Sequence, residues 1–137
     1  MRDSRTVTIL VVDDDEVDVM GLRRAFAKLR IINPVHVAND GAEAWEMLDS
    51  LPRPFLVITD INMPRMSGLE LLQKIRESEK FHSTVVFVLT TSDDDEDKLN
   101  AYNLNATGYI LKSDLKGSFT RAIELVENYW KVVELPA

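Results

Sequence analysis

Four apolar runs of this sequence each end in a polar or charged side chain that is suited to chemistry. The runs, with the residues that end them, are 7–12 with Asp13 and Asp14, 55–59 with Asp60, 85–89 with Thr90, and 109–111 with Lys112. A carboxylate at the end of a buried strand is costly unless a cation, hydrogen bonds or a reaction accounts for it. Because open parallel sheets form their binding sites at the carboxyl ends of the strands, this repetition predicts a functional site at one sheet edge.

Acidic side chains gathered at one sheet edge repel one another. Two carboxylates about 4 Å apart repel by roughly 4 kcal/mol at an effective dielectric of 20, so either one stays protonated or a cation neutralises the site. Mg²⁺ suits such a site because it takes carboxylate and carbonyl oxygens, keeps several waters and often binds a phosphate oxygen. Lys112 adds a charge suited to a phosphoryl group, and Thr90 adds a hydroxyl donor. Carboxylate, metal, ammonium and hydroxyl together are typical of phosphoryl transfer, which depends mostly on positioning and charge neutralisation.

Stretches with the period of amphipathic helices separate the apolar runs, a pattern typical of repeated βα units around a parallel sheet. We expect strands at about 7–12, 34–38, 55–59, 85–90 and 108–112, and helices at about 15–29, 41–51, 67–78, 94–104 and 114–133. Ser67 and Asp114 are the expected N-caps of the third and fifth helices. Right-handed crossovers then predict an α/β fold with one doubly wound sheet of five parallel strands and five helices. For such a sheet we expect the flavodoxin-like strand order 2-1-3-4-5. In that order the first and third strands are neighbours, so their terminal acids converge in one crevice.

Length and composition favour one globular domain. The chain has 137 residues, of which 45% are hydrophobic and 28% charged, a size that suits a single core. We expect one domain over residues 1–137, with a core at about 6–127. The C-terminal segment, about 128–137, is rich in apolar residues, and we expect it to form a partner surface, such as a homodimer contact.

Charge and cysteine content exclude several classes of function. The net charge of −7, with no basic tract, argues against a nucleic-acid partner. The chain has no cysteine, which excludes disulfides and thiolate metal sites and fits a reducing compartment. The apolar stretch from Val7 reaches Asp13 too soon for a signal peptide, and no segment approaches the roughly 20 apolar residues of a membrane span, so we expect neither. We therefore expect a cytoplasmic protein with no membrane partner.

The residues at the strand ends also carry a family pattern. The pattern consists of Asp13-Asp14 after the first apolar run, Asp60-x-x-Met63-Pro64-x-Met66-x-Gly68, Thr90, and Tyr109-x-x-Lys112. In these residues and their spacing the chain resembles the receiver domain of two-component response regulators, the CheY-like family, over nearly its whole length. The resemblance implies that Asp60 accepts a phosphoryl group from a sensor histidine kinase or a histidine phosphotransferase.

The resemblance also implies roles for the other site residues. Asp14 and Asp60 would bind Mg²⁺ directly, together with the backbone carbonyl of Asn62, while Asp13 would act mainly through water. Thr90 would follow the incoming phosphoryl group and Lys112 would pair with it. Tyr109 would report the change by moving inward. Phosphorylation would then stabilise a second form of the surface around the fourth helix, fifth strand and fifth helix.

The expected function is signalling through a partner. No output region is expected after the fifth helix, and such a receiver is not an enzyme beyond promoting its own phosphorylation and dephosphorylation. Leu89-Thr90-Thr91-Ser92 and the C-terminal Tyr129-Trp130 with Leu135-Pro136 resemble the stand-alone regulators of phytochrome-type sensor kinases.

Two other functions remain open from the residues alone. Asp13-x-Asp15-x-Val17 at the end of the first strand is similar to the nucleophile motif of haloacid-dehalogenase-type phosphatases, with Asp13 as nucleophile. That alternative does not explain the stretch 60–68, and the chain has no room for the substrate cap of such a phosphatase. A receiver that acts as an adapter without phosphate is the third possibility, although every chemical position is filled.

Overall fold

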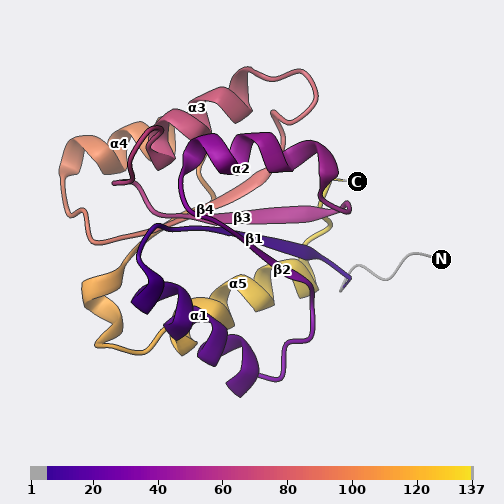
Figure 1. The fold of residues 1–137 in the computed structure, drawn as a ribbon, viewed down its shortest axis with the longest axis vertical. Coiled ribbons are helices and arrows are strands. Elements are labelled where there is room, and N and C mark those ends of the chain that lie inside the picture. Colours follow the sequence, from indigo (N-terminus) through magenta and orange to yellow (C-terminus); the bar gives the residue numbers. More distant parts are fainter. Residues whose placement is uncertain (1–5, 137) are drawn as a thin grey trace.

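The computed structural model describes residues 6–136, which form a parallel sheet with helices on both faces (Figure 1). The strands are β1 (Thr8–Val12), β2 (Val35–Ala38), β3 (Phe55–Thr59), β4 (Val85–Thr90) and β5 (Gly108–Leu111). The helices are α1 (Glu16–Lys28), α2 (Gly41–Met47), α3 (Gly68–Glu77), α4 (Asp95–Asn103) and α5 (Thr120–Val132), with short 3-10 helices at Leu48–Ser50 and Lys112–Leu115. In Figure 1, α1 and α5 cover one face of the sheet, and α2, α3 and α4 cover the other.

The strand order is β2-β1-β3-β4-β5, and all pairs are parallel. The predicted fold and order are therefore confirmed. Val12 is aligned with Thr59 on the neighbouring strand, and Thr90 is aligned with Leu111. Because the strands end in register, the residues that follow them emerge at the same edge of the sheet.

The sheet separates two hydrophobic clusters. β1, β3 and β4 are buried along their whole length, as expected for central parallel strands, whereas the edge strands β2 and β5 are mostly half-buried. Alternate residues of the central strands face opposite clusters: Ile9 lies in the cluster beneath α1 and α5, and Leu10 lies in the one beneath α2, α3 and α4. Both faces of the central strands are thus covered, which accounts for their continuous apolar runs.

Acidic and hydroxyl side chains begin four of the five helices. Asp15, Asp40 and Asp94 accept backbone N–H groups at the first turns of α1, α2 and α4. Ser67 caps α3 as predicted, and Glu70 completes a capping box with it. Each cap satisfies donors that the first helical turn leaves unpaired.

The predicted start of the fifth helix is wrong. Asp114 lies in the 3-10 helix that follows β5, and α5 begins only at Thr120 with no side-chain cap. Lys116 and Gly117 have φ values of 51° and 83°, in the left-handed region that ends a helix. The two positive φ angles therefore divide the expected helix into two parts.

The packed core extends past residue 127. Trp130 is 1% exposed and Leu135 is 7% exposed, and both belong to the cluster beneath α1 and α5. These side chains therefore complete the chain's own core and are not available to a partner. Val132 is 84% exposed, so it remains on the surface. Ala137, the last residue of the predicted tail, lies outside the described residues.

Within residues 6–136, none of the helices has both the length and the apolar character that crossing a membrane requires.

Candidate functional site

The ammonium of Lys112 joins three acidic side chains at the carboxyl edge of the sheet. Lys112 Nζ donates to Oδ2 of Asp13 at 2.8 Å, of Asp60 at 2.9 Å and of Asp18 at 2.7 Å. An ammonium has three hydrogens, so its donor capacity is fully used. The structure thus brings Asp13, Asp60 and Lys112 together, as the strand ends predicted, and adds Asp18 from α1.

The two central carboxylates are buried. Asp13 is 3% exposed and Asp60 is 8% exposed. Their second oxygens accept backbone N–H groups: Asp13 Oδ1 from Asp15 at 2.9 Å, and Asp60 Oδ1 from Ile61 at 2.7 Å. Burial raises the pKa of Asp13 above its usual range, with a smaller increase from the Asp60 charge, and the hydrogen bonds from Lys112 and Asp15 offset part of this change.

Lys112 remains a cation at this edge. Burial alone lowers the pKa of Lys112, but its hydrogen bonds to the three carboxylates outweigh burial and raise that pKa above its ordinary value. Three carboxylates around one ammonium leave negative charge in excess. The edge is therefore electrostatically suited to further positive charge.

Asp14 and Asn62, the other predicted metal ligands, face solvent. Each follows an end of the neighbouring strands β1 and β3, and the carboxylate of Asp14 makes no hydrogen bond or ion pair within residues 6–136. Among those residues, no three His, Cys, Asp or Glu side chains are grouped as ligands around one point. The structure brings Asp13 and Asp60 together through Lys112 and leaves Asp14 outside that contact.

Thr90 and Tyr109 both contact the backbone of Ser92, in the loop between β4 and α4. Thr90 is fully buried, and its Oγ1 accepts from Ser92 N at 3.2 Å. Tyr109 is half-buried, and its hydroxyl donates to Ser92 O at 2.8 Å. Burial raises the pKa of the Tyr109 phenol, so this hydroxyl stays protonated and continues to donate. A displacement of Thr90 would disturb the residue to which Tyr109 is bonded.

The loop after Asp60 is held in a fixed path. A Cβ added to Gly68 would lie 1.8 Å from the carbonyl oxygen of Asp60, so only glycine fits where α3 begins. Gly68 N donates to Ile61 O at 2.8 Å. Arg65, at φ 64°, donates to Asp40 Oδ2 at 2.8 Å through Nε, which ties the loop to the start of α2.

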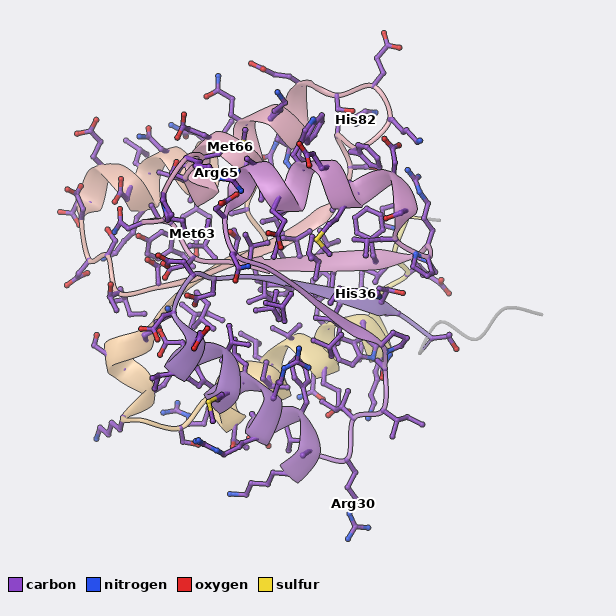
Figure 2. All side chains as sticks on the ribbon, viewed as in Figure 1. Arg30, His36, Met63, Arg65, Met66 and His82 are labelled. Atoms are coloured by element: carbon purple, nitrogen blue, oxygen red, sulfur yellow. The ribbon has the colours of Figure 1, made fainter. Side chains whose placement is uncertain are left out.

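The side chains of this loop lie apart from the two histidines. Figure 2 shows Met63, Arg65 and Met66 together on one side of the molecule, and His36 and His82 well away from Met63. Within residues 6–136, neither histidine is a hydrogen-bond or ion-pair partner of Asp13, Asp60 or Lys112.

Two residues that contact the site, Asp18 and Ser92, were assigned no role in it from the sequence. Asp18 has the appearance of an ordinary acid in the first turn of a helix, where it complements the positive end of the helix dipole. Ser92 contributes backbone atoms alone to Thr90 and Tyr109, so its side chain carries no signal. Only the distance from Thr90, two residues along the chain, could have indicated Ser92.

Comparisons with known proteins agree with this geometry. The family model described as the response regulator receiver domain matches residues 9–124. The probable methanogenesis regulatory protein FilR2 of Methanothrix harundinacea is 33% identical over 129 residues, which cover 89% of this chain and 82% of FilR2. Response regulator Rcp1 of Synechocystis is 31% identical over 137 residues, which cover 94% of this chain and 92% of Rcp1.

Solved structures of similar proteins have the same fold. The crystal structure of the phosphorylated cyanobacterial phytochrome response regulator RcpA superposes with a TM-score of 0.85 at 28% identity, over 95% of this chain and 98% of RcpA. The crystal structure of the Mn²⁺-bound form of Rcp1 superposes with a TM-score of 0.82 at 28% identity, over 95% of this chain and 99% of Rcp1.

Proposed function

This chain belongs to the response regulator receiver domain family, and from that membership we infer that it is a phospho-acceptor of two-component signal transduction. We propose that Asp60 is the residue that receives the phosphoryl group. The observation that carries this assignment is the contact of one buried ammonium, Lys112, with the carboxylates of both Asp60 and Asp13. A buried acid beside a fixed cation is suited to accept a group that carries negative charge.

The proposed reaction is a transfer from a phosphohistidine of the donor protein. An Asp60 carboxylate oxygen forms a bond to phosphorus, the phosphorus–nitrogen bond breaks, and the bonding pair remains on the histidine nitrogen. Lys112 then pairs with the phosphoryl oxygens. In the unphosphorylated protein Thr90 Oγ1 accepts from Ser92 N. The hydroxyl of Thr90 moves toward the phosphoryl group and donates to one of its oxygens, because a hydrogen bond to a charged acceptor is strong.

We propose Mg²⁺ as the cofactor of this edge, with Asp14, Asp60 and the carbonyl of Asn62 as ligands and Asp13 acting mainly through water. Three observations support this assignment: the excess of negative charge, the raised pKa of Asp13, and the exposed carboxylate of Asp14, which has no hydrogen bond or ion pair within residues 6–136. Carboxylate and carbonyl oxygens are the ligands that Mg²⁺ prefers. When bound, the ion supplies positive charge that neutralises the transferring group. The Mn²⁺ bound to Rcp1, a similar protein, fits a divalent cation here.

The proposed signal passes from Thr90 to Tyr109. Both side chains are hydrogen-bonded to the backbone of Ser92. A shift of the Thr90 hydroxyl toward a phosphoryl group therefore breaks its hydrogen bond with Ser92 N and moves the loop that Tyr109 contacts. Tyr109 then turns inward, and the surface formed by α4, β5 and α5 changes. The phosphoryl group acts by stabilising this second state.

The proposed partners follow from similar proteins. RcpA is a phytochrome response regulator, so we propose a sensor histidine kinase of the phytochrome type, or a histidine phosphotransferase, as the donor. We also propose a cytoplasmic, non-enzymatic protein that forms a homodimer. Since Trp130 and Leu135 are buried in the core, the dimer contact must use other apolar side chains, of which Val132 is the most exposed at this end of the chain.

Labelling with a small phosphodonor tests the proposed function. Wild type, Asp60→Asn and Asp13→Asn are incubated with acetyl phosphate and Mg²⁺, and the mass of each intact protein is followed. We expect one phosphoryl group on wild type, none on Asp60→Asn, and none on wild type when the metal is chelated.

Asp13→Asn separates the alternatives. A receiver with a damaged metal site is labelled more slowly, but the label remains on Asp60. Label on Asp13 of the wild type would establish the haloacid-dehalogenase-type alternative, and an unlabelled wild type would establish the adapter. Undiminished labelling in chelator would reject the metal.

A further inference from the structure

Asp18 contacts Lys112, although it is not among the functional residues predicted from the sequence. It lies in the first turn of α1, and its Oδ2 is 2.7 Å from Lys112 Nζ. The Lys112 side chain is 7% exposed and the Asp18 side chain is 23% exposed, so the pair is largely shielded from water. Shielded charge pairs are screened far less than surface pairs, so this contact is strong enough to fix the position of the ammonium.

The three acceptors of the Lys112 ammonium differ in what happens to them during phosphoryl transfer. Asp60 becomes an acyl phosphate, so its hydrogen bond from Lys112 passes to a phosphoryl oxygen. Asp13 would interact with the proposed Mg²⁺, mainly through water. Of these three acids, Asp18 alone neither becomes phosphorylated nor interacts with the proposed metal. Its hydrogen bond from Lys112 can therefore persist during phosphoryl transfer.

α1 also holds the far end of the segment that carries Lys112. A Cβ added to Gly21 would lie 2.7 Å from the ring of Phe119, so the absence of a side chain on Gly21 lets this ring pack directly against the helix. Asp18 and Gly21 are three residues apart and therefore lie on the same face of α1. One helix face thus contacts both ends of the segment 112–119.

We propose that Asp18 is a positioning residue for Lys112. It keeps the ammonium at the phospho-accepting edge while Asp13 and Asp60 change partners. This role rests on the proposed function, because it concerns the lysine that pairs with the phosphoryl group on Asp60. Asp18 itself does not touch that group.

Three variants separate positioning from a general effect of charge. Asp18→Ala removes both the charge and the acceptor, whereas Asp18→Asn keeps an acceptor oxygen. Glu16→Gln is the matched control, because it removes an acid from the same helical turn, and Glu16 is exposed and makes no contact with Lys112. Thermal unfolding of all three verifies that each variant is folded.

The first measurement needs no phosphodonor and no metal. The ammonium protons of ¹⁵N-labelled Lys112, assigned with Lys112→Met, are followed by NMR, and their exchange with water is timed. Loss of one charge-assisted hydrogen bond is expected to accelerate exchange about tenfold in Asp18→Ala. The acceleration is smaller in Asp18→Asn and absent in Glu16→Gln.

The second measurement is the rate of phosphorylation at saturating acetyl phosphate and Mg²⁺. We expect a decrease of about tenfold in Asp18→Ala, since an interaction of this size is lost from the transition state. Asp18→Asn recovers part of the rate, and Glu16→Gln keeps the wild-type rate. The donor concentration at half-maximal rate changes little, because Asp18 does not contact the donor.

The outcomes are distinguishable. A wild type that carries no label on Asp60 overturns the proposed function, and the role of Asp18 with it. A labelled wild type with equal rates in Asp18→Ala and Glu16→Gln overturns the positioning role alone. Equal rates of ammonium proton exchange in those two variants also overturn the positioning role, because the Asp18–Lys112 ion pair would then not restrain the ammonium.

Discussion

Every hydrogen of the Lys112 ammonium has a carboxylate acceptor before any phosphoryl group arrives. At this edge the lysine is therefore the resting counter-ion of Asp13 and Asp60 as well as the proposed partner of the phosphoryl group. The divalent cation proposed for this edge would compete with Lys112 for the carboxylate oxygens of Asp13 and Asp60. The affinity of the edge for that cation would then depend on this competition.

Replacement of Lys112 by methionine tests this competition. The variant leaves three carboxylates without their counter-ion, so the free energy of unfolding without metal should decrease by about 3 kcal/mol, the usual cost of breaking a buried pair. Because no ammonium competes, Mg²⁺ should raise the unfolding temperature of Lys112→Met more than that of the wild type. Thermal unfolding with and without Mg²⁺ measures both effects.

Lys28→Met is the control for Lys112→Met, because Lys28 is exposed on α1 and has no ion pair within residues 6–136. It should respond to Mg²⁺ as the wild type does. If Mg²⁺ stabilises Lys112→Met no more than this control, the lysine does not compete with the metal.

Residues that act through a side chain at a strand end were predictable, and those that act otherwise were not. Asp60 and Lys112 follow apolar runs, so parallel pairing alone places them at one edge. Asp18 reaches Lys112 from a helix surface, and its contact depends on how α1 docks onto the sheet. Ser92 acts through its backbone, which any residue type would supply.

At the scale of elements, α1 and the segment 112–119 form one unit. Lys112 is fixed at one end by Asp18, and Phe119 packs on Gly21 at the other. Glycine inside a helix costs about 0.5–1 kcal/mol relative to alanine, so its presence in α1 indicates that close approach of the ring outweighs this cost.

Gly21→Ala should lower the stability of the protein although it improves helix propensity. The added methyl group displaces the Phe119 ring from α1 and loosens the segment that carries Lys112. Denaturant unfolding should give a lower free energy for Gly21→Ala than for the wild type. In a Phe119→Ala background the ring is absent, so the same substitution should be stabilising, by about 0.5–1 kcal/mol.

The double-mutant comparison at Gly21 and Phe119 has a clear negative result. If Gly21→Ala stabilises the protein equally with and without the Phe119 ring, the two residues are not in tight contact, and α1 does not hold the far end of the segment.

The strands were predicted more accurately than the fifth helix for a physical reason. Central parallel strands are buried on both faces, so they are continuous apolar runs that polar residues end sharply. The apolar residues of the region 112–119 have helical spacing in the sequence, but two residues with left-handed backbone conformation interrupt the helix there. Lys116 gives no such signal in the sequence, because lysine is otherwise a good helix former.

At the scale of the whole molecule, the sheet separates two cores, and the C-terminal residues complete one of them. Trp130 is among the largest fully buried side chains, and Leu135 packs in the same cluster. A C-terminal aromatic residue after the last strand gives the same apolar pattern in a sequence whether it covers its own sheet or a partner. Only the packing distinguishes the two.

Trp130→Ala should therefore destabilise the folded protein. Removing a buried tryptophan side chain typically costs about 3–5 kcal/mol, and denaturant unfolding measures the loss. Val132→Ala, at an exposed position of the same helix, should change the free energy of unfolding by less than about 0.5 kcal/mol. Equal, small effects of the two substitutions would mean that the C-terminal segment is a surface feature after all.

Sedimentation of Val132→Ala addresses the proposed homodimer. A contact that involves the exposed end of α5 should weaken in Val132→Ala while the fold is unchanged. Self-association that is identical to the wild type in Val132→Ala would place the dimer contact elsewhere on the molecule.

The most direct measurement of the central claim is the chemical identification of the acceptor residue. Borohydride reduces the acyl phosphate of an aspartate to homoserine, which peptide sequencing by mass spectrometry then places in the chain. The phosphorylated wild type should contain homoserine at position 60 alone. Homoserine at position 13, or at no position, would contradict the assignment of Asp60.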